Sequence, residues 1–284
     1  MFQIEKFKET DEEFIELARI DNLVNHDSID HPDDDKRDWG MRDKSLIRDR
    51  LLLYKDEILV GAIYYSQGRD ENSQATFFTL NIDPNHNTSE SRDLLYNGML
   101  KEIKLFNSNK IFTSIYNHPN YDLVKDFLAD KKFKLVQTNR EYSCDITKID
   151  IEKYQPLIKK LESEGIKFYD SKEEMSDWPD HYKKLEELTW TYHQDFPIPN
   201  GVKHTRTPFE QAMKIQKDFE QNYYGTEIVA VKDGEYIGST DLEVYYKSEP
   251  HKAWTNGLGV LKEFRRKRIA TALKIKAIER LLDK

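Results

Sequence analysis

The chain contains the same short unit twice. Residues 55–61 and 232–238 align without a gap, and both begin with Lys-Asp and end with Gly. Each reads as a tight turn between two apolar strands, which is the pattern of a β-hairpin. A second apolar segment follows each hairpin at nearly equal distance, at 76–82 and at 253–261. This repeat predicts two halves of similar structure.

At 284 residues the chain is also longer than one hydrophobic core usually supports. We therefore expect two domains, at 1–150 and 151–284. The first should contain helices at 91–106 and 121–131 with a strand at 110–116 between them. Two closing strands are expected at 133–137 and 140–146. Periodic apolar positions and turn residues carry this interpretation.

The second half begins in a similar way but lacks the closing strands. Its expected helices are 180–191, 208–221 and an amphipathic helix from 269, after which the chain stops at Lys284 without a glycine cap. The predicted fold class is α/β, with two domains that each have a mixed, mainly antiparallel sheet flanked by helices. Soluble proteins avoid an unpaired apolar edge like the one expected at 253–261. We therefore expect either a C-terminally truncated chain, or an edge covered by the first domain or by a second chain in a homo-oligomer.

Composition excludes several classes of function. The net charge of −8 argues against a protein devoted to nucleic acid, which needs a basic surface. Uncharged stretches such as 58–67 are far too short to cross a membrane, and acidic residues near the N-terminus exclude a secretory signal. The single cysteine, Cys144, in a predicted strand, fits a reducing compartment, so a cytoplasmic location is expected. No spacing of His or carboxylate residues suggests a metal site.

The segment 257–274 carries the strongest indication of function. An apolar strand leads into a basic turn, and the turn leads directly into the amphipathic helix, with five cations between Lys262 and Arg268. Unpaired backbone N–H groups and the positive end of the helix then meet basic side chains, which predicts a phosphate-binding site. The alternative is a solvated helix start or a nucleic-acid patch.

This segment resembles the acyl-coenzyme A loop of the GNAT superfamily of N-acetyltransferases. The family motif has Arg or Gln, then Gly after two residues, then Gly or Ala; Arg265 and Ala270 match it, and Arg268 replaces the usual Gly. We expect Arg268 to be tolerated because a helical φ needs no glycine. The two halves together resemble a tandem GNAT protein. The resemblance implies acetyl-CoA as cosubstrate, bound at Leu258, Val260, Arg265, Arg266, Lys267, Arg268, Ile269, Ala270 and Thr271.

The corresponding turn of the first half departs further from the motif. Asn87, Glu90 and Arg92 occupy its three positions, so a carboxylate lies where the pyrophosphate would approach. We expect that this half binds no coenzyme A and acts as a structural domain.

The resemblance implies an acyltransferase that moves an acetyl group to the amine of a small molecule or peptide by direct attack. The general base is not evident; Glu243 is the candidate catalytic residue, with Asp241 and His251 nearby, although these residues also fit an exposed strand face. Substrate residues are expected at Trp190, His193 and Asp195, where a carboxylate and aromatic rings would attract an amine. Alternatively, Trp190 belongs to the core and Asp195 caps a turn.

A second reading is a catalytically weak or inactive tandem GNAT protein that binds a ligand or a partner. The absent base and Arg268 favour it. Nucleic-acid binding through the basic turn is a third class, which would show a steep dependence on salt.

Overall fold

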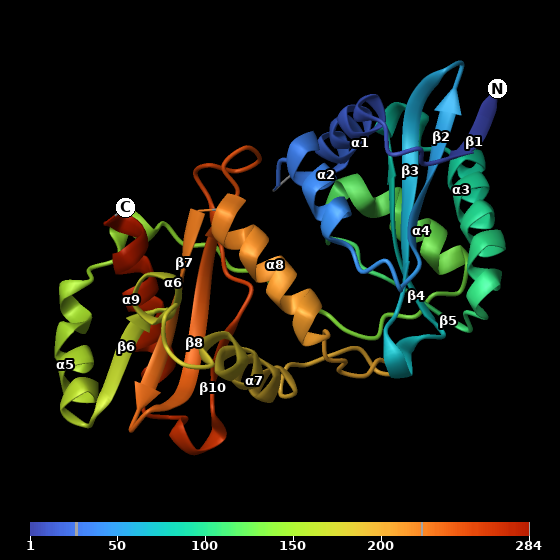
Figure 1. Cartoon of the computed structure of the whole chain (residues 1–284). Coiled ribbons are helices and arrows are strands. Elements are labelled where there is room, and N and C mark those ends of the chain that lie inside the picture. Colours follow the sequence, from blue (N-terminus) through green and yellow to red (C-terminus); the bar gives the residue numbers. More distant parts are fainter. Residues whose placement is uncertain (26–27, 223, 284) are drawn as a thin grey trace. The chain divides into compact units, whose positions relative to one another are not determined.

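The computed structural model describes residues 1–25, 28–222 and 224–283. The chain forms two compact units (Figure 1). Unit 1 contains Met1–Gln137 together with the short segments Pro199–Thr205 and Lys247–Glu249. Unit 2 contains Thr138–Ile198, Arg206–Tyr246 and Pro250–Lys284, of which Lys284 lies outside the described residues.

Unit 1 is built on a mixed, mainly antiparallel sheet. Its strand order is β1-β2-β3-β4-β5, in which only β4 and β5 run parallel. Its elements are β1 (Phe2–Lys6), α1 (Asp11–Val24), α2 (Pro32–Met41), β2 (Arg48–Lys55), β3 (Ile58–Gln67), β4 (Ala75–Ile82), α3 (Ser89–Glu102), β5 (Lys110–Thr113) and α4 (Asp122–Asp130).

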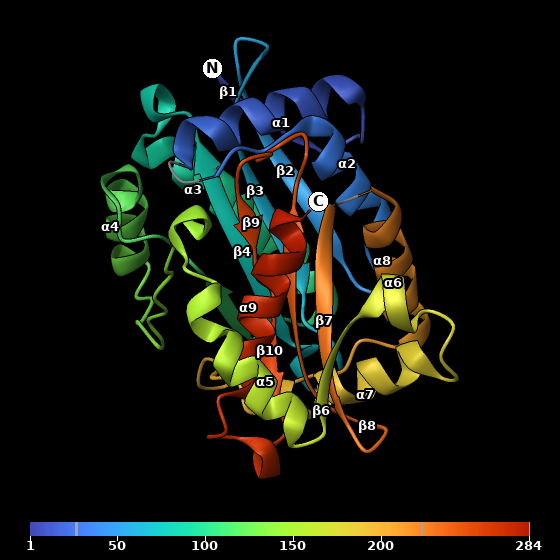
Figure 2. The ribbon, with the colours of Figure 1, turned by 90° about the vertical axis from the view of Figure 1, so that its left-hand side faces the viewer.

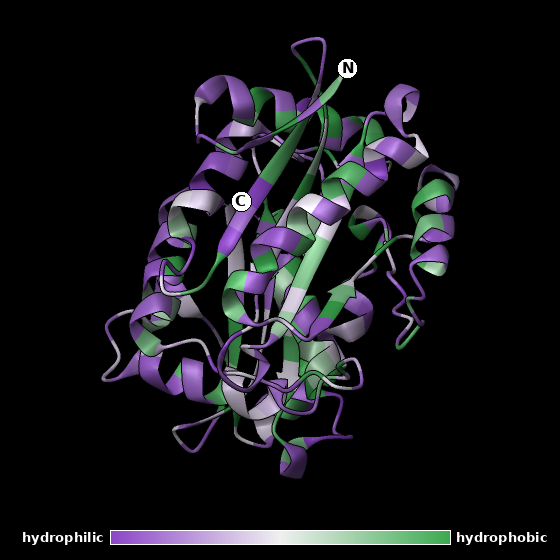
Figure 3. Ribbon diagram, turned by 90° about the vertical axis from the view of Figure 1, so that its right-hand side faces the viewer, coloured by the Kyte–Doolittle hydropathy of each residue, from purple (hydrophilic) through white to green (hydrophobic). Residues whose placement is uncertain are grey.

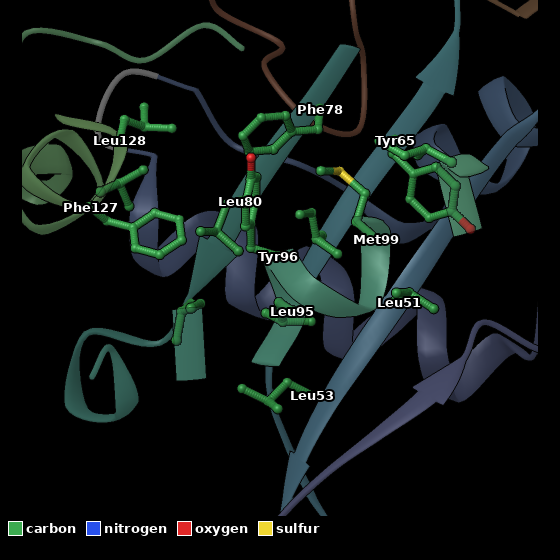
Figure 4. Packing of buried hydrophobic residues seen from close by; sticks show 14 of the residues in the cluster. Leu51, Leu53, Tyr65, Phe78, Leu80, Leu95, Tyr96, Met99, Phe127 and Leu128 are labelled. Atoms are coloured by element: carbon green, nitrogen blue, oxygen red, sulfur yellow. The ribbon is translucent and has the colours of Figure 1, made fainter. Parts of the chain in front are cut away.

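Helices cover both faces of this sheet. On one face, side chains of α3 and α4 such as Leu95, Met99 and Phe127 pack on the strands (Figure 4). On the other face, Phe14 of α1 and Trp39 of α2 pack against β2 and β3. Green apolar strands lie between helices that also carry purple polar positions (Figure 3), as expected for amphipathic helices on a sheet.

Unit 2 has a sheet of order β10-β8-β7-β6, with β9 also paired to β8, and all these pairs are antiparallel (Figure 2). One face packs against α5 and α9, and the other against α6 and α7. The elements are α5 (Gln155–Ser163), β6 (Ile166–Asp170), α6 (Ser171–Met175), α7 (His181–His193), α8 (Phe209–Asn222), β7 (Tyr224–Lys232), β8 (Glu235–Val244), β9 (Ala253–Trp254), β10 (Leu258–Val260) and α9 (Ile269–Leu282).

Both predicted hairpins are confirmed. In unit 1 the turn residues Asp56 and Glu57 have φ of 50° and 69°, and in unit 2 Asp233 and Gly234 have φ of 51° and 82°. Two consecutive left-handed residues give the turn that matches the twist of antiparallel strands. The hairpins therefore set the same strand register in both units.

Two strand predictions are wrong. The segments 133–137 and 140–146 contain no strand, and Leu135, Tyr142 and Cys144 are exposed. Their apolar pattern favours an extended chain, but a strand also needs a neighbouring backbone to pair with, which a local pattern does not reveal. The predicted strand 253–261 is split into β9 and β10, because Asp241 accepts hydrogen bonds from the N–H groups of Asn256 and Gly257 between them.

Candidate functional site

A tight basic loop joins β10 to α9. Arg266 and Arg268 have φ of 63° and 64°, both in the left-handed region, and Arg268 is the residue immediately before the helix. The expectation of a helical φ at Arg268 is therefore wrong. Glycine is favoured in this conformation because it has no Cβ to collide with the following carbonyl. Position 268 corresponds to the Gly position of the GNAT motif and has a left-handed φ, which favours glycine, but this chain has arginine there.

The first turn of α9 has no side-chain cap, because Arg268 makes no capping hydrogen bond. Unit 1 differs at the corresponding helix, α3. There Thr88 accepts a hydrogen bond from the N–H of Ser91, and Arg92 donates to the side-chain oxygen of Asn87 at 2.6 Å. The start of α3 is thus closed by its own side chains, whereas the positive end of α9 is available to an anion.

Asp195 ties the basic loop to the end of α7. Its carboxylate accepts from Arg265 at 2.6 Å and pairs with Lys262 at 2.9 Å, and these two cations hold the pKa of Asp195 below its usual value. Arg265 also donates to the carbonyl of Val260 at 2.8 Å. Arg265 and Asp195 therefore fix the loop, while the side chains of Arg266 and Lys267 are exposed.

A pocket of about 640 Å³ lies between α7, the β7–β8 turn and the start of the loop. Tyr192 and Asp195 of the predicted acceptor region line it together with Tyr236 and Arg265. The lining combines apolar side chains such as Leu188 and Leu261 with lysine and carboxylate side chains. The pocket therefore suits a ligand with both an apolar part and a charged group.

Tyr192 connects this pocket to the middle of the sheet. Its ring covers Gly259 so closely that a Cβ at that position would lie 1.9–2.2 Å from ring atoms. The Tyr192 hydroxyl is 3.1 Å from the hydroxyl of Ser239. Burial raises the pKa of Tyr192, so the phenol stays protonated and can donate a hydrogen bond.

Two carboxylates share the α7 side of the sheet beside Tyr192. Glu227 of β7 lies directly opposite Asp241 of β8 in the strand register. Burial, and then the nearby negative charge of Asp241, raise the pKa of Glu227 to about 8. Within the described ranges no lysine or arginine pairs with Glu227. A carboxylate in this state can accept a proton near neutral pH.

The remaining predicted residues lie around this centre. Glu243 is further along β8, opposite Gly225 and Trp254 in the register. Trp190 and His193 are on α7, where the Arg206 guanidinium is 5.9 Å from the Trp190 ring and the His193 ring is 4.6 Å from that of Phe196. Trp190 and His193 do not line the pocket, whereas Tyr192 and Asp195 do.

Unit 1 has a cation at the place that corresponds to Glu227. The hairpin alignment matches Arg50 and Tyr64 of unit 1 to Glu227 and Asp241, and Arg50 is likewise paired with Tyr64 in the register. Arg50 is 2% exposed and makes two hydrogen bonds of 2.6 Å with Asp35. Its guanidinium is 4.5 Å from the Trp39 ring. This place is therefore filled and neutralised in unit 1.

Sequence reasoning missed Glu227 and did not separate Tyr192 from its aromatic neighbours. A usable indication was present, because the gap-free hairpin repeat assigns Glu227 to the strand opposite Asp241. No metal centre emerges from the described residues, which contain no group of three or more His, Cys, Asp or Glu side chains suited to a metal ion. No helix in the described part of the chain is long and apolar enough to cross a membrane.

Comparisons with known proteins agree with this architecture. Residues 182–284 match the model of the acetyltransferase (GNAT) family. No curated protein matches the chain by sequence. A tandem GNAT protein from the clavulanic acid biosynthesis pathway has a similar structure, with a TM-score of 0.68 and 14% identity over 100% of this chain and 86% of that chain.

Two further structures are similar. A GCN5-related N-acetyltransferase from Sphaerobacter thermophilus gives a TM-score of 0.61 at 13% identity, over 98% of this chain and 82% of that one. A glucosamine N-acetyltransferase region of a fungal multi-domain GH3 β-N-acetylglucosaminidase gives 0.67 at 14% identity, over 100% of this chain and 34% of that one. At these identities the likeness concerns the fold.

The protein thus belongs to the class of two-unit α/β proteins with a tandem GNAT fold. Residues 182–284 in its second half match the GNAT family model, in agreement with the resemblance found in the sequence.

Proposed function

We propose that the protein transfers an acetyl group from acetyl-CoA to a primary amine, and that unit 2 performs the reaction. One observation carries the proposal: an uncapped, left-handed basic loop before α9 occurs in the same unit as Glu227, a carboxylate whose pKa is raised and which faces Asp241 in the strand register. The corresponding features of unit 1 are closed or neutralised. The division into a structural domain at 1–150 and a binding domain at 151–284 is part of the same proposal.

Acetyl-CoA would bind along the loop. The pyrophosphate would accept hydrogen bonds from N–H groups between Arg266 and Thr271, with the side chains of Arg266, Lys267 and Arg268 neutralising its charge. The pantetheine arm would run past the backbone of Leu258 and Val260 at the sheet edge. Arg265 would act by fixing the loop through Asp195.

The acceptor amine would lie near Tyr192, on the side of the sheet that carries the carboxylates. Glu227 would take the proton from the ammonium group, and the neutral amine would attack the thioester carbon. The C–S bond then breaks, and the thiolate takes the second amine proton. A base whose pKa is about 8 suits this task near neutral pH. Glu243 is the other candidate on β8, further from Tyr192 along the strand.

A small-molecule or peptide amine fits this charge pattern. The entry of the amine would be bordered by Trp190, His193 and Asp195. The negative charge of Asp195 is already neutralised by its ion pairs with Lys262 and Arg265. The acceptor's identity, a cytoplasmic location and the homo-oligomer that covers the edge stay predictions.

Calorimetry with acetyl-CoA tests the first step. The double variant Arg266→Glu and Lys267→Glu should weaken binding by about 10- to 100-fold, because it replaces two cations at the phosphate by anions. The matched control is Lys159→Glu and Lys160→Glu on α5, with the same change in net charge. Equal affinities in both double variants, or no binding at all, would refute the site.

Acetylation of a panel of polyamines, amino acids, aminoglycosides and peptides tests the reaction. Glu227→Gln should lower kcat by about 10²–10⁴-fold while acetyl-CoA still binds. Glu243→Gln is the comparison, and a larger loss in that variant would transfer the role to Glu243. Acetyl-CoA binding without turnover of any amine would favour the alternative, a non-catalytic module that binds a ligand or partner.

A further inference from the structure

The side chain of Lys274 ends at the break between β9 and β10. Its Nζ donates a hydrogen bond to Oγ1 of Thr255, which lies in that break. Lys274 is half-buried on α9, whereas Thr255 is exposed. Among the described residues no carboxylate forms an ion pair with Lys274, although Lys276 on the same helix pairs with Glu279 at 2.9 Å. Lys274 is therefore a cation without a paired anion at the edge of the sheet.

Side chains of β8 hold this break in place. Asp241 accepts hydrogen bonds from the N–H groups of Asn256 and Gly257 at 2.8 and 3.0 Å. Thr240 donates to the carbonyl oxygen of Gly257 at 2.9 Å, and Thr255 donates to the same oxygen at 3.4 Å. Both backbone groups of Gly257 are thus bonded to side chains, and the break has a defined position at the sheet edge.

Partial burial makes the Lys274 ammonium more responsive to an anion. It lowers the pKa of Lys274, and the charges of Asp241 and Cys144 oppose that shift. The Asp241 carboxylate is already occupied by the two N–H groups of the break. A negative charge that arrives beside Nζ would therefore be stabilised more than by a fully hydrated lysine.

This cation is a feature of unit 2. The alignment of the two motif turns, in which Glu90 corresponds to Arg268, places Tyr96 of α3 at the position of Lys274. Tyr96 is packed in the core of unit 1. The same helix position thus contributes to the core in one unit and carries a charge to a strand break in the other.

The proposed course of acetyl-CoA ends at this break. The pyrophosphate would lie at the start of α9, and the pantetheine arm would follow the backbone of β10 toward its first residue, Leu258. This strand is three residues long, which corresponds to about 10 Å. An extended pantetheine arm covers that length, so the thioester would lie beside residues 255–257, where the Lys274 side chain ends.

We propose that the ammonium group of Lys274 stabilises the thiolate of CoA as it leaves, an assignment that rests on the proposed acetyl transfer. The attacking nitrogen forms its bond to the carbonyl carbon, and the electron pair of the breaking C–S bond passes to sulfur. The positive charge of Lys274 offsets the negative charge that develops there. Lys274 keeps its own protons, and the thiolate then takes the second proton of the amine.

CoA labelled with ¹³C at the carbon bonded to sulfur tests this assignment in the full chain. Lys274→Gln removes the charge but keeps N–H donors for Thr255, and Lys274→Arg keeps the charge. A nearby opposite charge lowers a pKa by about 1–3 units, and a half-buried cation should give the lower value. The thiol midpoint of bound CoA should therefore be about one pH unit higher in Lys274→Gln than in the wild type, and unchanged in Lys274→Arg.

The acetylation rate is the second measurement. Lys274→Gln should lower kcat by about 10- to 100-fold, since one group that stabilises developing charge is lost from a partly open site. Lys274→Arg should stay within a few-fold of the wild type. The matched control is Lys276→Gln, which removes a cation from the same helix and should change neither the thiol midpoint nor kcat.

The two measurements separate this inference from the proposed function. Equal thiol midpoints in the wild type and Lys274→Gln, with CoA bound to both, would overturn the inference; acetylation of an amine would then still support the proposed function. A loss of stability at an unchanged midpoint would mean that Lys274 only holds the strand break. If the midpoint moves but no amine is acetylated, the role at the thiol holds and the proposed transfer fails. A wild type that binds no CoA would refute both.

Discussion

Replacing Arg268 by glycine should stabilise unit 2. Arg268 has φ of 64°, and an ordinary residue in the left-handed region loses about 1–2 kcal/mol through contact of its Cβ with the following carbonyl. Glycine removes that contact but loses about 0.5–1 kcal/mol through the greater freedom of the unfolded chain. The expected net gain is about 0.5–1 kcal/mol. Arg268→Ala removes the same charge and keeps the Cβ, so it should not be stabilised.

Urea unfolding followed by tryptophan fluorescence measures this difference. Trp178, Trp190 and Trp254 belong to unit 2, so the signal reports mainly that unit. The midpoint should rise for Arg268→Gly at unchanged slope. Lys267→Gly is the control, because Lys267 is outside the left-handed region and should lose about 0.5–1 kcal/mol. A glycine variant no more stable than the alanine variant would refute the strain argument.

Three further predictions concern stability. Burial raises the pKa of Glu227 to about 8 in the folded chain, whereas an unfolded chain leaves it near the usual 4.5. Its contribution to folding stability is therefore fully present below pH 4.5 and is lost as pH rises through 8. Glu227→Gln should accordingly be more stable than the wild type by a few kcal/mol at pH 9, and urea titrations should converge toward pH 4.5. Gly259→Ala should lose about 3 kcal/mol because the Tyr192 ring must shift, whereas Gly257→Ala, with only the hydroxyl at 3.3 Å, should lose little in the same assay. Arg50→Ala should lose about 3 kcal/mol by leaving Asp35 unpaired, with the acetylation rate per folded molecule unchanged.

Local turn chemistry made the hairpins predictable. The Asp and Gly or Glu residues at 56–57 and 233–234 favour left-handed φ values, and the alignment of the two turns follows from sequence alone. Helices with a clear apolar periodicity were also predicted within a few residues, as for 208–221 and α8. In these cases the information lies in a short stretch of chain.

Other features depend on partners far away in sequence. The acidic residues Asp33, Asp34 and Asp35 form the first turn of α2, capped by His31, where negative charge favours a helix N-terminus. Asp34 is buried there, which composition alone does not indicate. The prediction of closing strands at 133–137 and 140–146 failed for the same reason, because a strand forms only where another part of the chain offers an edge to pair with. The pKa of Glu227 is likewise raised by burial and then by the charge of Asp241, a neighbour only through the strand register.

The two units place opposite charges at the same point of a common register. In unit 1 the guanidinium of Arg50 is held by Asp35 and by aromatic rings, so the buried charge is fully compensated. In unit 2 the half-buried carboxylate of Glu227 has an anionic neighbour instead, and a desolvated carboxylate without a cation lowers stability. Such a cost persists where the group serves a purpose, because selection for stability alone would remove it. The contrast therefore agrees with the proposal that unit 2 performs the chemistry, since the corresponding charge in unit 1 is already paired with Asp35.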